Sequence, residues 1–187
     1  MKFNYGKIFI LGSGYFGLSA IWVTYNSFVP LFLQERFFLT PSGIGFYMTL
    51  DNIAALFLLP FFGAWSDRVN TPIGRRIPFI AAGIPVAAAA FFLVPAAEKL
   101  PLFAAFTVTL ILSMSIWRTP VMALMADITP SPHRSQANGI INFMGGIGGI
   151  TAAVAGGILF AADQSYPFWM GGGLLITAGI ILFIFIK

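Results

Sequence analysis

Long apolar runs divide this chain into six segments, separated by charges, prolines or small polar residues. Each run is close to the roughly 20 residues that an α-helix needs to cross a bilayer. A β-barrel would instead need segments of about ten residues with alternating polarity, whereas this chain has unbroken runs such as Ile53 to Phe62. The pattern predicts an all-α membrane protein whose six transmembrane helices lie at about residues 8–33, 43–65, 78–96, 102–126, 136–162 and 168–186.

Composition leads to the same class. Hydrophobic residues make up 58% of the chain and charged residues only 9%, about a third of the charge of a soluble domain, so the chain cannot cover a water-facing surface. The first apolar run follows Lys2 and Lys7 as in a signal peptide, but it is too long for one, and we interpret it as a retained helix. We expect residues 1–187 to form a single transmembrane domain.

Lysine and arginine are distributed unevenly between the two ends of the predicted helices. An even number of spans puts both chain termini on one side of the membrane. Seven basic residues fall on that side and two on the other, so the positive-inside rule makes it cytoplasmic. The seven are Lys2, Lys7, Arg68, Arg75, Arg76, Arg134 and Lys187, and the two are Arg36 and Lys99. We therefore expect a multi-pass protein of the cell membrane, and its net charge of +4 requires no nucleic acid partner.

Polar residues within the spans are confined to four helices. Asn26 lies in the first, Asp51 and Asn52 in the second, Arg118 in the fourth and Asn142 in the fifth. Such groups are costly against lipid and normally face a bundle interior or a cavity. We expect the first, second, fourth and fifth helices to be inner and the third and sixth to be peripheral, in a three-plus-three arrangement.

The fifth helix also carries small residues at four-residue spacing, namely Gly145, Gly149, Ala153 and Gly157. A stripe of small residues lets a neighbouring backbone approach closely. We expect another helix to pack against this stripe.

Two polar loops carry charges at a spacing typical of one transporter family. Between the second and third helices, Gly63-Ala-Trp-Ser-Asp67-Arg68 is followed, after five residues, by Gly74-Arg75-Arg76-Ile-Pro78-Phe79. This stretch resembles the signature loop of the major facilitator superfamily, and the trailing Pro-Phe is most similar to its glycoside and sucrose cation symporter branch. Between the fourth and fifth helices, Ala126-Asp127, His133-Arg134 and Ala137-Asn138 resemble the matching loop of sucrose transporters.

The resemblance covers the chain as an amino-terminal six-helix half. It implies a half-size secondary active transporter, with proton-coupled uptake of a sugar or glycoside by alternating access after pairing with a second six-helix unit. Because such halves are related by an axis along the membrane normal, the second unit could be another copy of this chain or a separate carboxyl-terminal half. A truncated chain without activity is the alternative.

The resemblance also implies that the first loop acts as a cytoplasmic gate. Asp67 would accept hydrogen bonds from a helix amino-terminus of the facing half or from nearby guanidinium groups. The expected gate residues are Gly63, Asp67, Arg68, Gly74, Arg75, Arg76, Asp127 and Arg134. Alternatively, the arginines only set the topology and bind anionic lipid headgroups.

The chain departs from the family pattern at three places. Its fifth helix lacks the Gly-Pro pair of the antiporter signature, which argues against a drug exporter. Sodium-linked relatives carry paired acidic residues in the second helix where this chain has Ala54 and Leu58, which argues against sodium coupling there. The sugar-binding arginine of plant sucrose transporters corresponds to Met122, and Arg118 lies one turn further in.

Asp51 is the candidate for proton coupling, with Tyr47 one turn away and Asn26 across from it, because burial favours the protonated form of a carboxyl group. Alternatively, Asp51 is a structural residue bonded to helix ends or to Asn52. At a rise of about 1.5 Å per residue, Asp51 and Arg118 lie at depths of about 12 and 24 Å. We therefore expect two layers and no direct salt bridge between them.

Substrate contact is expected from Arg118 and Trp117, which offer donors beside an apolar face. On the first helix, a semi-polar stripe suited to a cavity wall contains Tyr15, Ser19, Trp22 and Asn26. The candidate substrate-binding residues are thus Arg118, Trp117, Asn26, Trp22 and Tyr15. The alternatives are an arginine bonded to carbonyls at the Pro120 kink or snorkelling to the interface, and aromatic residues that only pack.

Other classes of protein have less support. The sequence has no metal cluster, nucleophile–base pair or phosphate loop, so we expect neither an enzyme nor a cofactor, only a coupling ion. It also has no cysteine for disulfides or thiolate metal sites. Two alternatives stay open: a non-transporting subunit, and a facilitative carrier or channel formed by a homo-oligomer. A non-transporting subunit would need neither a buried acid nor a buried arginine.

Overall fold

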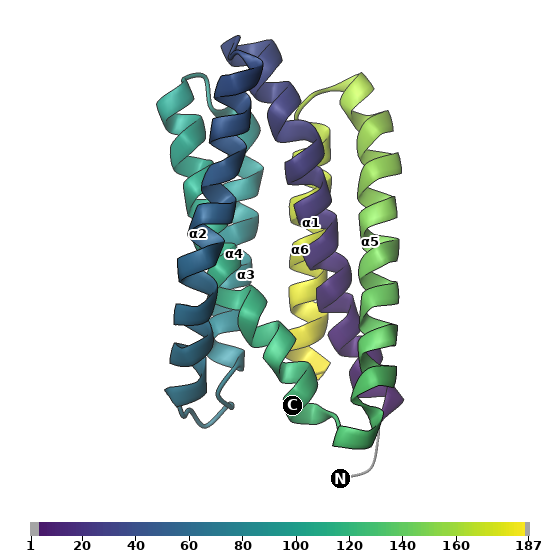
Figure 1. Cartoon of the computed structure of the whole chain (residues 1–187). Helices are drawn as coiled ribbons and strands as arrows, with labels where there is room; N and C mark the ends of the chain where they lie inside the picture. Colours follow the sequence, from purple (N-terminus) through teal and green to yellow (C-terminus); the bar gives the residue numbers. More distant parts are fainter. Residues whose placement is uncertain (1–3, 186–187) are drawn as a thin grey trace.

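The computed structural model describes residues 4–185 and is built from long helices (Figure 1). Six of them are long and apolar enough to cross a membrane. They are α1 (Tyr5–Phe37), α2 (Pro41–Arg68), α3 (Ile77–Leu93), α4 (Leu100–Ile128), α5 (Arg134–Ala162) and α6 (Tyr166–Phe185), with short 3-10 turns η1 (Val94–Ala96) and η2 (Ser131–His133). This confirms the predicted six-helix, all-α class. Lys2 and Lys187, which entered the charge count, lie outside the described residues.

Most helices extend a few residues beyond the predicted apolar cores, and polar side chains cap the starts of two of them. The side chain of Asn4 accepts a hydrogen bond from the backbone N–H of Lys7 at the start of α1. Thr40 does the same for Gly43 at the start of α2, where Pro41 occupies the first helical turn. These caps satisfy backbone groups that apolar residues cannot.

The six helices form two groups of three. In one group α1 packs against α5 and α6, and in the other α4 packs against α2 and α3. The groups meet chiefly where α3 packs against α6, and α2 and α5 form opposite flanks of the bundle (Figure 1). The three-plus-three arrangement expected from the sequence is therefore present.

In this unit taken alone, burial does not follow the expected division into inner and peripheral helices. α2 has only two buried residues, Asp51 and Ser66, and both are polar. α3 instead buries eight of its 17 residues. A polar residue in a span indicates that its own face avoids lipid, but the rest of the helix can still be exposed.

Aromatic side chains join the two groups at one level of the bundle. Phe32 of α1 stacks on Phe103 of α4, with ring centroids 5.5 Å apart. The same ring meets Phe168 of α6 edge-on at 5.6 Å. All three side chains are fully buried, so this cluster fixes the relative positions of α1, α4 and α6.

Small residues bring α5 into close contact with α1, and only part of the expected stripe takes part. Gly145 and Gly149 of that stripe face Ser19 and Val23 of α1. The small residues buried along α5 include Gly145, Gly148, Ala152 and Gly156. A Cβ atom at Gly148 would lie 2.3 Å from the carbonyl oxygen of Phe16, whereas one at Gly157 would have nothing within 4 Å. A helix has about 3.6 residues per turn, so a contact face follows a mixture of three- and four-residue steps and a strict four-residue series drifts away from it.

Replacing Gly148 with Ala is expected to lower the thermal unfolding temperature of the purified protein. The new methyl group would overlap the backbone of α1, and overpacking of this kind costs about 1–3 kcal/mol, or about 2–4 °C for each kcal/mol. Gly146→Ala is the matched control, because a Cβ there meets nothing within 4 Å. Equal unfolding temperatures for the two variants would show that α5 does not pack on α1 at this glycine.

Candidate functional site

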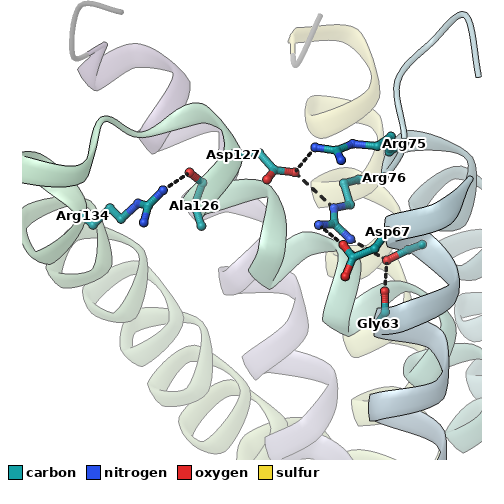
Figure 2. Close-up of polar contacts among 8 residues, drawn as sticks. Gly63, Asp67, Arg75, Arg76, Ala126, Asp127 and Arg134 are labelled. Carbon is teal, nitrogen blue, oxygen red and sulfur yellow. Dashed lines mark hydrogen bonds and ion pairs between the residues drawn. The ribbon is translucent and has the colours of Figure 1, made fainter. Parts of the chain in front are cut away.

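Arg76, just before α3, is the centre of a polar network between the second and third helices (Figure 2). Its guanidinium group lies 2.5 Å from the carboxylate of Asp67 on α2. Its Nε donates to Asp127 of α4 at 3.2 Å, and Nη1 donates to the Ser66 hydroxyl at 2.6 Å. The Arg76 side chain is only 8% exposed. A buried charge is tolerated where it is paired and hydrogen-bonded, so this side chain holds α2, α3 and α4 together.

The other predicted gate residues differ in how they relate to the network of Arg76. Arg75 is half-exposed and lies 4.0 Å from Asp127, and Arg134 donates to the carbonyl of Ala126 at 3.2 Å (Figure 2).

The two glycines and Arg68 lie at the edge of the network. Gly63 accepts a hydrogen bond from the Ser66 hydroxyl. Gly74 has a φ of 102°, which suits glycine at this tight turn. Arg68 is exposed and makes no ion pair within residues 4–185.

For Asp67, the sequence allowed two kinds of partner, and in this structure the partner is a guanidinium group, that of Arg76. Ser66 is part of the network but was not predicted. Its position as a polar residue directly before Asp67, at the end of an apolar run, is the signal that would have identified it.

A second site lies within the spans, where α1, α2 and α4 meet. It is a small cavity with room for about one water molecule. The lining residues are Trp22, Asp51, Ala55, Leu59, Ile111, Met114, Ser115 and Arg118. Asp51 and Arg118 therefore line one cavity, which extends from Asp51 to Leu59 along α2 and from Ile111 to Arg118 along α4. The bond of Thr119 to the Leu59 carbonyl puts Arg118 at the level of Leu59, so the two ionisable residues still belong to different levels of the spans. As expected, no direct ion pair joins the two residues in the described part of the chain.

The Arg118 guanidinium lies over the Trp22 ring, 5.7 Å from its centroid, in a cation–π contact. Its Nε atom is buried and has no hydrogen-bond partner among residues 4–185. The alternative in which Arg118 donates to backbone carbonyls at the Pro120 kink is therefore not supported for this Nε atom. Tyr15, also on α1, is buried within electrostatic range of Arg118.

Three of the predicted substrate residues, Trp117, Asn26 and Tyr15, do not line the cavity. Trp117 is fully buried and packs against α3, where a Cβ atom at Gly83 would lie 2.7 Å from its side chain. The expectation that Trp117 offers a free apolar face beside Arg118 is contradicted, because consecutive helical residues point in different directions. Asn26 is exposed, and its side-chain amide donates to the Trp22 carbonyl at 2.9 Å.

Asp51 is 4% exposed, and one carboxylate oxygen accepts hydrogen bonds from the backbone N–H and side-chain amide of Asn52, at 2.8 and 3.1 Å. Tyr47, the other residue assigned to proton coupling, has its hydroxyl bonded to that of Thr107 on α4. Tyr25 lies nearby on α1, fully buried, stacked on Trp22 at 5.6 Å and within electrostatic range of Asp51. Sequence reasoning missed Tyr25, because an aromatic residue on a membrane helix usually only packs.

The exposed surface has two contrasting faces. Exposed amides within the spans include Asn26, Asn52 and Asn142, which come from α1, α2 and α5. Between α3 and α6 there is instead a groove of about 660 Å³ lined only by apolar residues and glycine. Amides are costly against lipid, so the α3/α6 face suits a bilayer better than the amide-bearing face does.

The structure has six membrane-length helices, paired charges at one end and two ionisable residues at a cavity among the spans, and it is that of a multi-pass membrane protein. The family model of the Major Facilitator Superfamily matches residues 11–187, and the chain belongs to this superfamily. It is also 24% identical, over 162 residues, to a lactose permease of Citrobacter freundii. That alignment covers 84% of this chain and 38% of the permease, so the chain spans well under half of that relative's length.

Proposed function

We propose that this chain forms one half of a secondary active transporter that takes up a sugar or glycoside together with protons. The chain would lie in the cell membrane, with both termini in the cytoplasm. The observation that carries the proposal is the cavity that Asp51 and Arg118 share within the spans of a major facilitator chain. Charged residues at this depth are costly and are typical of substrate and proton pathways.

A sugar is the substrate class that best suits these residues. Arg118 carries several N–H donors, one of which has no partner in the described part of the chain, and the Trp22 ring beside it is apolar. Sites for such ligands combine apolar and aromatic walls with a few placed polar groups. Similarity to a lactose permease supports the same class.

The sugar site would be completed by a second six-helix unit. The cavity holds about one water molecule, whereas a small-molecule site needs about 300–1,000 Å³. The face that carries Asn26, Asn52 and Asn142 would then line the pathway and meet the second unit. That unit is another copy of this chain or a separate carboxyl-terminal half, and the two halves would alternate around a site between them.

The network of Arg76 would close the cytoplasmic end of this pathway. It joins α2, α3 and α4 through Asp67 and Asp127, beside the loops that connect these helices. An outward-open state would keep these contacts, and opening toward the cytoplasm would break or rearrange them.

Counterflow in proteoliposomes tests the proposal directly. Vesicles containing the chain, alone or with a candidate carboxyl-terminal half, would be loaded with unlabelled lactose or sucrose and diluted into the labelled sugar. We expect transient accumulation of label, and uphill uptake when an inward proton gradient is imposed. Downhill flux that does not saturate, or the absence of flux with either preparation, would contradict the assignment as a carrier.

Replacing Arg118 with Lys is expected to weaken sugar affinity in counterflow by about tenfold. Lysine keeps the charge, but it lacks the planar fork that stacks on Trp22 and donates in several directions. Arg36→Lys is a matched control, because that guanidinium lies over the Phe32 ring at 5.1 Å but outside the cavity. Equal losses for both variants would point to general destabilisation.

A further inference from the structure

Tyr25 is a fully buried side chain whose hydroxyl makes no hydrogen bond within the described residues. A buried donor without an acceptor is costly, and most such groups in folded proteins find a partner. Phenylalanine would keep the stacking on Trp22 without this cost. A tyrosine here therefore suggests that its hydroxyl bonds to another group in some other state of the protein.

The acceptor available to Tyr25 is the carboxylate of Asp51. Only one of the two Asp51 oxygens is engaged by Asn52, and the other accepts no hydrogen bond from residues 4–185. The other ionisable groups around this point are Tyr47 of α2, Arg118 of α4 and Tyr15 of α1. The Tyr47 hydroxyl is already paired with Thr107, and Arg118 donates hydrogen bonds and cannot accept them.

A bond between Tyr25 and Asp51 would cross the junction between the two three-helix groups. α1 packs mainly on α5 and α6, and α2 packs mainly on α4. Direct contacts between α1 and α2 therefore contribute little to holding these two helices together. One buried hydrogen bond at mid-span would change how strongly α1 is held to α2.

We propose that Tyr25 is a positioning residue for Asp51, donating a hydrogen bond to the ionised carboxylate and losing that bond when Asp51 takes up a proton. The proposal rests on the proposed function, in which Asp51 carries the coupling proton. Tyr25 keeps its own proton throughout. The protonation state of Asp51 thereby sets how strongly α1 is held to α2. Proton binding is in this way linked to movement of the two three-helix groups.

A thermal unfolding cycle on the purified chain at neutral pH tests the contact without any transport assay. Tyr25→Phe is expected to lower the unfolding temperature by about 2–4 °C in the wild-type background. It should leave that temperature unchanged, within about 1 °C, in an Asp51→Leu background, because leucine has a similar shape and offers no acceptor. Tyr47→Phe is the control. It removes the bond between the Tyr47 and Thr107 hydroxyls, so it should lower the unfolding temperature by the same amount in both backgrounds. Equal effects of Tyr25→Phe in the two backgrounds would overturn the proposal.

Transport provides the second measurement. In proteoliposomes, Tyr25→Phe is expected to lower proton-driven uphill uptake by about tenfold and to leave counterflow within about twofold of wild type. A purely structural role would lower both to the same extent, which would refute the positioning role. If the wild-type chain transports no sugar, the proposed function fails, and the unfolding cycle still decides whether Tyr25 and Asp51 interact.

Discussion

Asp51→Asn should abolish proton-driven accumulation of sugar while counterflow survives. Asparagine has nearly the same shape as aspartate, so the cavity shared with Arg118 keeps its walls, but an amide cannot take up and release the coupling proton. Exchange of labelled for unlabelled sugar needs no net proton movement. We expect uphill uptake to fall by about 100-fold and counterflow to change by less than about threefold.

The measurement is uptake of labelled sugar into proteoliposomes with an imposed proton gradient, repeated over a range of external pH. Asp163→Asn is the control, because this acid lies in the loop after α5 and outside the spans. The backbone N–H of Ser165 donates to its carboxylate at 2.7 Å and lowers the pKa of Asp163, so it stays ionised near neutral pH and takes no part in coupling. Uptake by Asp51→Asn that matches wild type at every pH would mean that another group carries the proton.

The membrane class and the six spans could be read from the sequence because they depend only on runs of apolar residues. The polar loop residues were also located correctly, since Asp67, Arg76 and Asp127 flank helix ends whose positions the runs already define. The identity of their partners could not be read in this way. Whether Asp67 meets a guanidinium group or a helix end depends on how α2, α3 and α4 converge, which no local pattern encodes.

The mid-span cavity was predicted less well, for physical reasons that particular residues illustrate. Arg118 and Asp51 were expected at separate levels, and the sequence did not show that one cavity along α2 and α4 reaches both. Trp117 turns into the core because it lies about 100° around the helix from Arg118. On α5, Gly148 packs more closely against α1 than Gly149 does and Gly157 meets nothing within 4 Å, because a helical face does not repeat every four residues. These errors concern the direction of side chains around a helix, which the spacing of polar residues along the chain determines only loosely.

Arg76→Gln is expected to cause the largest loss of stability. Removing this guanidinium leaves the carboxylates of Asp67 and Asp127, which it now bridges, without their shared cation, and it breaks the link to Ser66. Deleting one partner of a buried ion pair costs about 3–5 kcal/mol. Asp67 is 59% exposed and water compensates part of its loss, so we expect about 2–3 kcal/mol here. The unfolding temperature would fall by about 5–10 °C.

Two further variants separate the network from its net charge. Arg75→Gln also removes one positive charge, but Arg75 is half-exposed and 4.0 Å from Asp127, so the unfolding temperature should fall by less than about 2 °C. In the triple variant with Asp67→Asn, Arg76→Gln and Asp127→Asn, no unpaired carboxylate remains, and we expect about half of the lost stability to return. A triple variant less stable than Arg76→Gln would show that the two acids are stabilised by groups other than Arg76. The contacts that hold α2 to α4 at this end would then lie outside the proposed gate.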